Sequence, residues 1–146
     1  MTLKYEFFDH TADIGVHIYG ATLPELFSNA AQAMYEVMGS FQKAGVPAKG
    51  EERRAKSVKL EASTLEDLLH DWLTELLYDF ATHQVLYDRL DITEATPQRV
   101  VATVTGGVVD FARSEPREEI KAVTYHKLRV EQNAKDRWQA TIIFDV

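Results

Sequence analysis

Two carboxylates, an imidazole and a hydroxyl lie within five positions near the start of the chain. They belong to residues 9–15, with the sequence DHTADIG, a segment that contains no lysine or arginine. Side chains of these types can transfer protons, and carboxylates also bind metal ions. Asp, His and Thr between strands also bond local backbone groups and simply shape a turn. The rest of the chain therefore decides whether this segment does chemistry.

The hydrophobic pattern sets the direction of one acid in this segment. Apolar residues occupy every second position from Ile14 to Ile18, which predicts a half-buried strand with Asp13 on the polar face. The same alternation runs from Trp138 to Phe144, so Asp145 also points away from the core. Both acids thus lie at strand ends, where their side chains can face one solvent-filled cleft.

Three carboxylates would converge if these two strand ends meet. The third is the α-carboxylate of Val146, if Val146 is the native terminus. Carboxylates that are brought together repel one another, but a hard divalent cation, which favours oxygen ligands, allows them to coexist. The pattern therefore indicates a candidate metal site of Asp13, Asp145 and Val146. The alternative is that the two aspartates are ordinary solvated surface residues.

Lys121 and His126 are the other candidates in the last quarter of the chain. Lys121 opens an expected strand at residues 120–130, where its ammonium could neutralise an acidic site or bind a phosphate oxygen as a point charge. A solvated lysine at a strand end is the simpler interpretation. His126 has the parity of the apolar residues of that strand, which predicts a partly buried, hydrogen-bonded histidine.

Two helices are predicted from capping signals and apolar stripes. The first begins with a capping box at residues 22–25 and ends at Gly39. The second begins with a capping box at residues 63–66 and carries a stripe of Leu, Trp and Phe at helical spacing. His70 and His83 lie on or near this second helix. Both are expected at the surface, since neither has a partner at metal-binding spacing.

The order of the elements predicts an α+β fold. Strands are expected at residues 5–8, 14–18, 58–62, 85–93, 99–105, 120–130 and 138–144, with a loop at 41–56 and a longer loop beginning at Gly106. Strands, helix, strand, helix and then a run of strands favour a largely antiparallel sheet with two helices packed on one face. A chain of 146 residues with 45% hydrophobic residues and no cysteine forms one domain, residues 1–146, without disulfides.

Several functional classes are unsupported. The net charge of −7 argues against tight nucleic-acid binding by this protein alone, because such binding depends on clustered Lys and Arg. A basic protein partner remains compatible with it. The chain has no Walker loop, no GxGxxG motif and no apolar run long enough for a membrane span. Its start is charged and strand-like rather than a secretory signal, so the cytoplasm is the expected location.

Three motifs in this order resemble the archease family. They are DHTADIG at residues 9–15, KAVTYH at residues 121–126 and the terminal DV at residues 145–146. The resemblance extends over essentially the whole chain, including the Leu/Trp-rich second helix and EPREE at residues 115–119. It implies a small cytoplasmic protein that assists an RNA-splicing ligase of the RtcB type. Archeases promote formation of the ligase–guanylate intermediate from GTP and allow multiple turnovers, but are not ligases themselves.

The resemblance also implies roles for individual residues. Asp13 and Asp145 match the metal ligands of the family, with the carboxylate of Val146 beside them. Calcium is the expected ion, with magnesium or manganese as alternatives. Lys121 matches the functional basic residue, and His10 and His126 are expected in supporting roles.

The chain departs from the family pattern at Gly107, where relatives often carry glutamate, and at Ser114, where they often carry histidine. Two other interpretations remain open. One is a small metal-dependent phosphoester hydrolase that uses His10 and Asp13. The other is a chaperone-like scaffold module whose acids only stabilise a turn. The oligomeric state and the RNA pathway served are left open.

Overall fold

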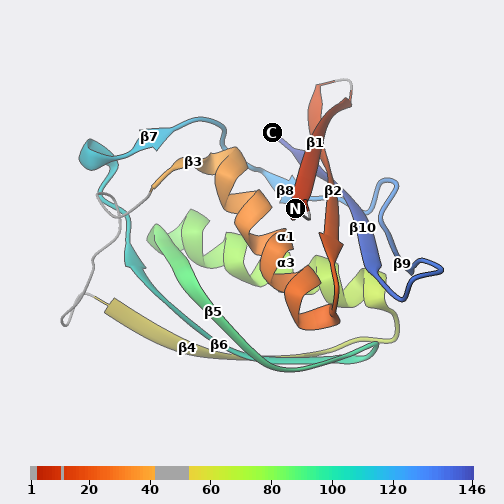
Figure 1. Cartoon of the computed structure of the whole chain (residues 1–146). Helices are drawn as coiled ribbons and strands as arrows, with labels where there is room; N and C mark the ends of the chain where they lie inside the picture. The colour runs from red at the N-terminus through yellow and green to blue at the C-terminus, as the bar shows by residue number, and fades with distance from the viewer. Residues whose placement is uncertain (1–2, 11, 42–52) are drawn as a thin grey trace.

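Two helices lie between two antiparallel sheets in the computed structural model, which describes residues 3–10, 12–41 and 53–146 (Figure 1). The helices are α1 (Leu23–Met38) and α3 (Leu65–His83). The first sheet has the order β1-β2-β10-β8, and β9 also pairs with β10. Its strands are β1 (Tyr5–His10), β2 (Asp13–Gly20), β8 (Ala122–Val123), β9 (Arg129–Gln132) and β10 (Trp138–Asp145).

The second sheet has the order β4-β6-β5 and covers the other side of the helices. Its strands are β4 (Arg53–Glu61), β5 (Val85–Thr96) and β6 (Arg99–Val108). A short pair, β3 (Gly39–Ser40) with β7 (Glu115–Pro116), and a 3₁₀ turn η1 (Phe111–Arg113) complete the described elements. The α+β class and the antiparallel pairing are as predicted from the sequence. The strands, however, divide between two larger sheets instead of forming one.

Helix α1 forms where its capping residues predict. The Thr22 hydroxyl accepts the backbone N–H of Glu25 at 3.2 Å, and the Glu25 carboxylate accepts the N–H of Ala21 at 3.3 Å. The helix ends at Gly39, whose φ of 152° disfavours any L side chain. A Cβ there would also lie 2.6 Å from the backbone oxygen of Glu115, so Gly39 allows β7 to approach the helix end.

Helix α3 begins one residue later than its predicted capping box. Thr64, not Ser63, is the cap, and its hydroxyl accepts the N–H of Asp67 at 3.1 Å. The carboxylate of Glu66 is thereby free of a capping role and accepts the N–H of Val130 in β9 at 2.9 Å. The predicted stripe is the centre of the core, where Trp72 is fully buried and its indole N–H donates to the Phe27 oxygen at 2.9 Å. Each large side chain buried in this way contributes roughly 1.5–3 kcal/mol.

Several expected boundaries differ from those in the structure. Strand β6 continues through Gly106, where the loop was expected. Glycine allows β5 to pair closely here, since a Cβ at this position would lie 1.8 Å from the Leu86 oxygen of β5. Residues 53–56 belong to β4, and residues 42–52 of the expected loop lie outside the described residues. The expected strand at residues 120–130 is two short strands, since Lys127 adopts a left-handed conformation, φ 55°, between them.

A buried polar network joins α3 to the second sheet. Asp79 is only 8% exposed, and its carboxylate accepts the Lys56 ammonium at 2.9 Å and the Tyr87 hydroxyl at 2.6 Å. Lys56 also donates to Glu75 at 2.6 Å. A charge buried in this way requires partners, and here it has two.

None of the helices in the described parts of the chain has the length and apolar character needed to cross a bilayer.

Candidate functional site

The pairing of the first sheet brings the two ends of the chain together. The last aligned pair of β2 and β10 is Ile14 with Phe144, so Asp13 and Asp145 are the next residues on neighbouring strands. On the far side of β10, Asp145 is aligned with Ala122 of β8. The sequence alone did not show whether the two strand ends meet, and the structure places them side by side.

Both acids project to the face of the sheet that lies away from the helices. Phe144 is fully buried against the core, and side chains alternate along a strand, so Asp145 faces outward. Asp13 is outward for the same reason and is half-buried, with its side chain 30% exposed. The open side of β1, β2 and β10 is visible in Figure 1, where α1 packs on the opposite side of β2.

His10 lies beside Asp13 at the end of the β1–β2 hairpin. The two residues are aligned across the hairpin, and His10 Nδ1 is 3.9 Å from Asp13 Oδ2. The ring centroid of His10 is 5.0 Å from that of His126. The structure thus brings both histidines of the predicted set together. His126 is exposed, however, and not partly buried as its parity predicted, because the chain turns at that position.

Lys121 is held at the same sheet end by its backbone. Its N–H donates to the Asp145 carbonyl at 2.7 Å, and its side chain is exposed. Because Ala122 is the residue aligned with Asp145, the alternation does not put the Lys121 ammonium on the face of the two acids. Lys121 is therefore adjacent to the acids along the backbone, and its side chain is exposed.

The donor set at this sheet end suits a hard cation. Asp13 and Asp145 offer carboxylate oxygens, and Val146 follows Asp145 and packs against the core. Oxygen-only ligands are the preference of calcium and magnesium rather than of softer metals. Within residues 3–10, 12–41 and 53–146, no three His, Asp or Glu side chains come close enough together to hold an ion. A cation here would therefore need oxygens in addition to the two aspartate carboxylates, from the backbone, from water or from a bound molecule.

Further side chains occupy the same outer face. Phe8 stacks on His17 with ring centroids 4.5 Å apart, and His17 Nδ1 is 3.1 Å from the Thr141 hydroxyl. Gly15 leaves room for the Phe8 ring, since a Cβ there would be 2.3 Å from it. Ile143 is fully buried but stands apart from the main core cluster. The alternation of polar residues in the second strand was the signal that could have identified His17.

His70 attaches the KAVTYH segment to α3, in contrast to the surface position expected for it. Its Nε2 is 3.0 Å from the Val123 oxygen, and its Nδ1 is 3.2 Å from an oxygen of Asp71. The ring also stacks on Tyr125, with centroids 4.0 Å apart. The partner on the other segment lies 53 positions away, so sequence spacing gave no signal for it.

A large cavity lies elsewhere in the part of the molecule that the structure describes. It has a volume of about 820 Å³ and lies between α1 and β5, with Tyr5, Glu36 and Asp88 in its walls. Neither Asp13 nor Asp145 lines it. The candidate site is therefore a patch at a sheet end, separate from this cavity.

Comparisons with known proteins match the chain to one family over nearly its whole length. A model of the Archease protein family (MTH1598/TM1083) matches residues 5–146. A protein archease of Methanosarcina acetivorans is 40% identical, covering 98% of this chain and 96% of its own length. One of Thermococcus gammatolerans is 36% identical, covering 98% and 99%.

Two solved structures are similar over nearly the full length. The solution structure of Methanobacterium thermoautotrophicum protein 1598 has a TM-score of 0.73 and 32% identity, covering 98% of this chain and 99% of its own. A crystal structure from Thermotoga maritima, described as an archease and possible chaperone, has a TM-score of 0.66 and 25% identity, covering 95% and 94%.

Proposed function

The chain belongs to the archease family, and from this we propose that it activates an RNA-splicing ligase of the RtcB type. In this role the protein promotes the GTP-dependent guanylylation of the ligase and allows repeated turnover, in tRNA splicing or RNA repair. It acts through protein contact and is not itself the enzyme.

One observation carries the proposal beyond family membership. The register of β2 and β10 makes Asp13 and Asp145 neighbours on an open face, where their oxygens suit a hard cation. Calcium is the ion we propose, with Asp13, Asp145 and the carboxylate at Val146 as its ligands; magnesium or manganese would use the same oxygens. When bound, such a cation would offer positive charge to phosphate oxygens.

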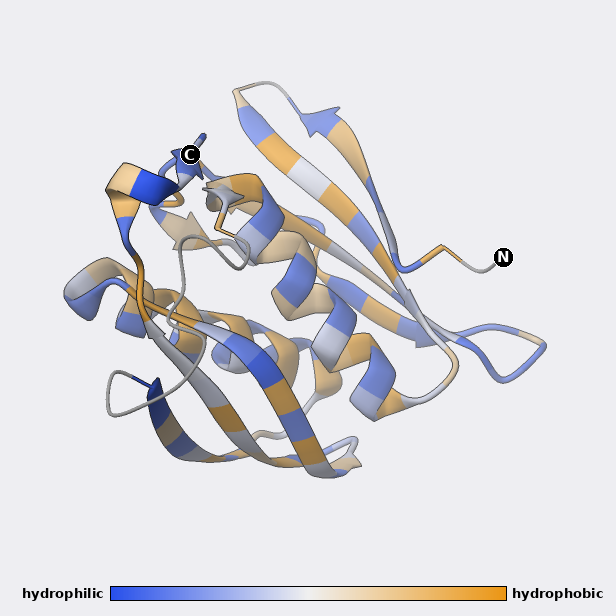
Figure 2. Ribbon diagram, turned by 60° about the vertical axis from the view of Figure 1, so that its left-hand side comes forward, coloured by the Kyte–Doolittle hydropathy of each residue, from blue (hydrophilic) through white to orange (hydrophobic). Residues whose placement is uncertain are grey.

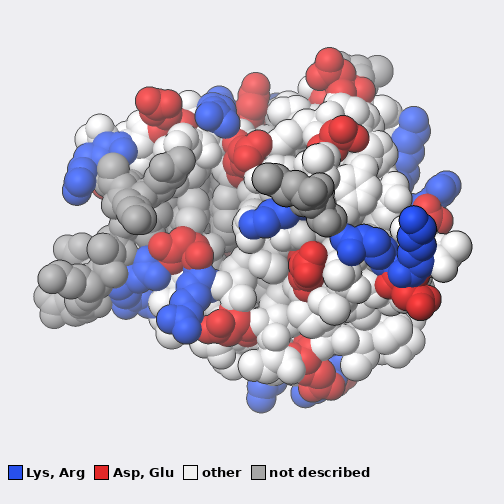
Figure 3. All heavy atoms as spheres, viewed as in Figure 1, with Lys and Arg blue, Asp and Glu red and all other residues white. Residues whose placement is uncertain are grey.

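The chain's own side chains complete this role. The exposed Lys121 ammonium can reach phosphate oxygens of GTP or of the guanylate, where a cation stabilises charge that develops during transfer. His10 supports the site from the hairpin end, 3.9 Å from the Asp13 carboxylate, and His126 packs beside His10. The RNA stays with the ligase. The net charge of −7 agrees with that division, and Figure 3 shows Lys and Arg interspersed with Asp and Glu on the face it displays.

The direct test is a guanylylation assay with a purified RtcB-type ligase, GTP and metal. Wild-type protein should raise the rate at which the ligase–guanylate forms. Asp13→Asn and Asp145→Asn should lose this stimulation because they remove the ligand charge at nearly constant shape. Lys121→Ala should lose it as well, since the ammonium is removed.

The matched control is Asp136→Asn, an exposed acid in the β9–β10 turn that should stimulate like wild type. Full stimulation by Asp13→Asn and Asp145→Asn would sink the proposal. Circular dichroism of each variant separates a lost site from a lost fold.

A chaperone role is the second candidate, because the Thermotoga maritima relative is described as a possible chaperone. A general chaperone would suppress the aggregation of an unrelated unfolding protein such as citrate synthase. An activator of one ligase should leave that aggregation unchanged while stimulating guanylylation. The two assays on one preparation therefore separate the candidates.

A further inference from the structure

Three phenylalanine rings from three segments meet at the end of the molecule near β7. Phe41 follows β3, Phe80 lies in the last turns of α3, and Phe111 begins the 3₁₀ turn. Their ring centroids are 5.6, 6.2 and 6.3 Å apart, each pair in an edge-to-face arrangement. Such pairs are favourable beyond the area they bury, so the rings form a defined surface rather than a loose cluster.

These rings line a cavity of about 400 Å³, here called the phenylalanine groove. Its main apolar walls are Met38, Phe41, Leu77, Phe80, Phe111 and Ile120. Most of these walls are buried, but Phe111 is 43% exposed at the mouth. In Figure 2 the 3₁₀ turn lies at the edge of the ribbon and is apolar over its first residues and hydrophilic at its end. A groove of this volume matches one large side chain and its neighbours, as in the pockets that hold hot-spot residues at interfaces.

The charges at the groove favour a basic occupant. Glu118 and Glu119 lie in its lining and are both exposed. Arg117 also lines the groove, but its guanidinium donates to the Glu36 oxygen at 3.3 Å and is thereby turned towards α1. The lining therefore carries two carboxylates and one guanidinium, which leaves a net charge of −1 with the two carboxylates facing solvent. A partner segment with lysine or arginine beside its apolar residue complements them, and one with acidic residues is repelled.

The wall of the groove is continuous with the candidate site. The Arg117 N–H donates to the Met38 oxygen at 2.8 Å, and the Glu118 N–H donates to the Val37 oxygen at 3.3 Å, which fixes this segment to the end of α1. Three residues further on, Lys121 bonds to Asp145. A partner that fills the groove is thus held beside the segment that leads to Lys121.

We propose that the phenylalanine groove is a docking site for a segment of the partner protein that carries one large apolar side chain flanked by lysine or arginine. That the ligase supplies this segment rests on the proposed function. The groove fixes the partner on the protein, and the acids at the sheet end act on the bound guanylylation site.

The first arm of the test does not involve the ligase. The peptide acetyl-Lys-Trp-Arg-amide is titrated into the protein, and shifts are followed by NMR. Shifts should concentrate at Phe80, Phe111 and Ile120. They should be lost in Phe111→Ala, with acetyl-Glu-Trp-Glu-amide and with acetyl-Lys-Ala-Arg-amide.

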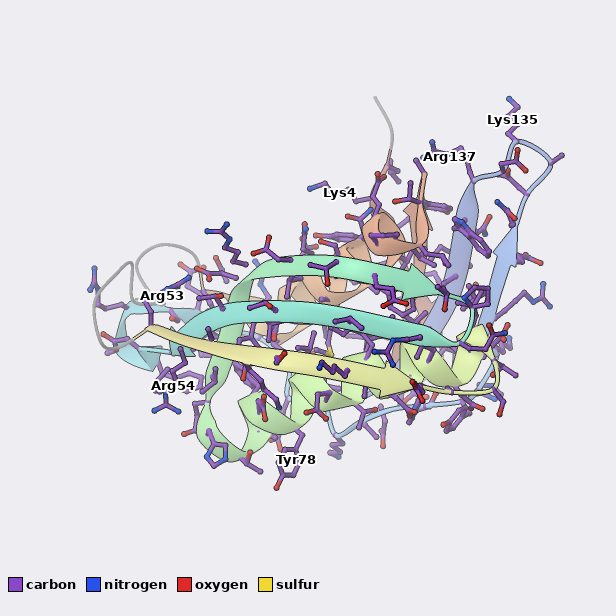
Figure 4. The ribbon with its side chains drawn as sticks, turned by 90° about the horizontal axis from the view of Figure 1, so that it is seen from below. Lys4, Arg53, Arg54, Tyr78, Lys135 and Arg137 are labelled. Atoms are coloured by element: carbon purple, nitrogen blue, oxygen red, sulfur yellow. The ribbon has the colours of Figure 1, made fainter. Side chains whose placement is uncertain are left out.

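The second arm measures affinity for the purified ligase by biolayer interferometry. Phe111→Ala should weaken it about tenfold or more, as expected for a hot-spot aromatic. The double variant Glu118→Lys, Glu119→Lys should weaken it as well and reduce its salt dependence. Asp136→Asn, in the β9–β10 turn, should keep the affinity. The matched control is Tyr78→Ala, which removes an aromatic that is 61% exposed on α3 and points into solvent (Figure 4).

The outcomes separate this proposal from the proposed function. Unchanged ligase affinity in Phe111→Ala and in the double charge variant overturns the groove, even if wild type stimulates guanylylation. Peptide shifts that depend on Phe111 support the groove chemistry even if stimulation fails, and in that case the ligase is rejected as the partner. A fall in melting temperature of Phe111→Ala with unchanged affinity for peptide and ligase shows that the chain itself fills the groove, which also overturns the proposal.

Discussion

At the scale of single residues, Asp13 and Asp145 illustrate what local patterns reveal. The two-residue period of each strand was enough to turn both acids away from the core, and burial of Val16 and Phe144 agrees with it. Their adjacency came only from the register of β2 and β10. The outward direction of a side chain is local information, whereas its neighbour depends on which strands pair.

Calcium should stabilise the protein through these acids. A ligand that binds only the folded state raises the free energy of unfolding, by about 2.7 kcal/mol at one hundred times its dissociation constant. We expect the melting temperature to rise with added calcium chloride and to fall back with a chelator. Asp13→Asn and Asp145→Asn should melt at a calcium-independent temperature, whereas Asp136→Asn should respond like wild type. A calcium response that survives both substitutions would place the ion elsewhere.

His70 should matter for the KAVTYH segment and not for the chain as a whole. Replacement His70→Ala removes the contact to the Val123 oxygen and the stack on Tyr125. We expect faster amide exchange at residues 122–126, with the free energy of local opening there lowered by about 1–3 kcal/mol, and little change in the urea unfolding of the whole chain. His83→Ala, at an exposed position on the same helix, should stay within about 0.5 kcal/mol of wild type. Equal effects of the two would mean that the His70 contacts are not stabilising.

At the scale of elements, the helices were the most predictable parts of the chain. A long apolar stripe and a capping residue specify a helix without knowledge of its neighbours, and both helices form where these signals predict, α3 with its cap one residue later than expected. The later strands were harder. The end of β6 depends on how closely Gly106 approaches β5, and the break between β8 and β9 depends on a turn in which the Thr124 hydroxyl bonds both His126 and Ile143. No local sequence pattern predicts the contacts with β5 and Ile143, because they join residues that are distant in the chain.

Helix α3 should tolerate charge on one face only. Leu73 is fully buried in the core, and Leu73→Asp would place a carboxylate there without a partner. We expect this variant to lose its folded signal in circular dichroism and to aggregate in gel filtration. Thr74→Asp introduces the same charge at the next, exposed position and should remain folded and monodisperse. A soluble, folded Leu73→Asp protein would contradict the packing described for α3.

At the scale of the whole molecule, polar bonds join the layers in addition to the apolar core, and two of these ties involve a tyrosine hydroxyl. The first joins the edge strand β1 to α1, through the Tyr5 hydroxyl that donates to Glu36 at 2.8 Å. The second is the network of Lys56, Asp79 and Tyr87 between the second sheet and α3. Composition alone could not reveal either tie, because each joins residues from separate layers. Both depend on a phenol that keeps its proton.

These ties should make the protein sensitive to alkali. Burial and the bond to Glu36 raise the pKa of Tyr5 from 10 to about 12, and burial and the bond to Asp79 raise the pKa of Tyr87 as well. Burial lowers the pKa of Lys56, but its bonds to Asp79 and Glu75 raise it further, so the net shift is upward. Each group therefore holds its proton more tightly when the protein is folded.

The sign of the effect follows from this. Stabilisation by Tyr5 is complete below pH 10 and is lost as the pH rises from 10 to about 12, since the unfolded chain releases the proton first. We expect the free energy of unfolding, measured in urea, to fall across this interval while ultraviolet absorbance reports the phenolates. In Tyr5→Phe the free energy of unfolding should fall less steeply with pH, because the phenolic proton of Tyr5 is absent from both states. Tyr78→Phe removes an exposed phenol, so its free energy of unfolding should fall with pH as steeply as that of wild type. If Tyr5→Phe falls as steeply as wild type too, the tie between β1 and α1 does not contribute.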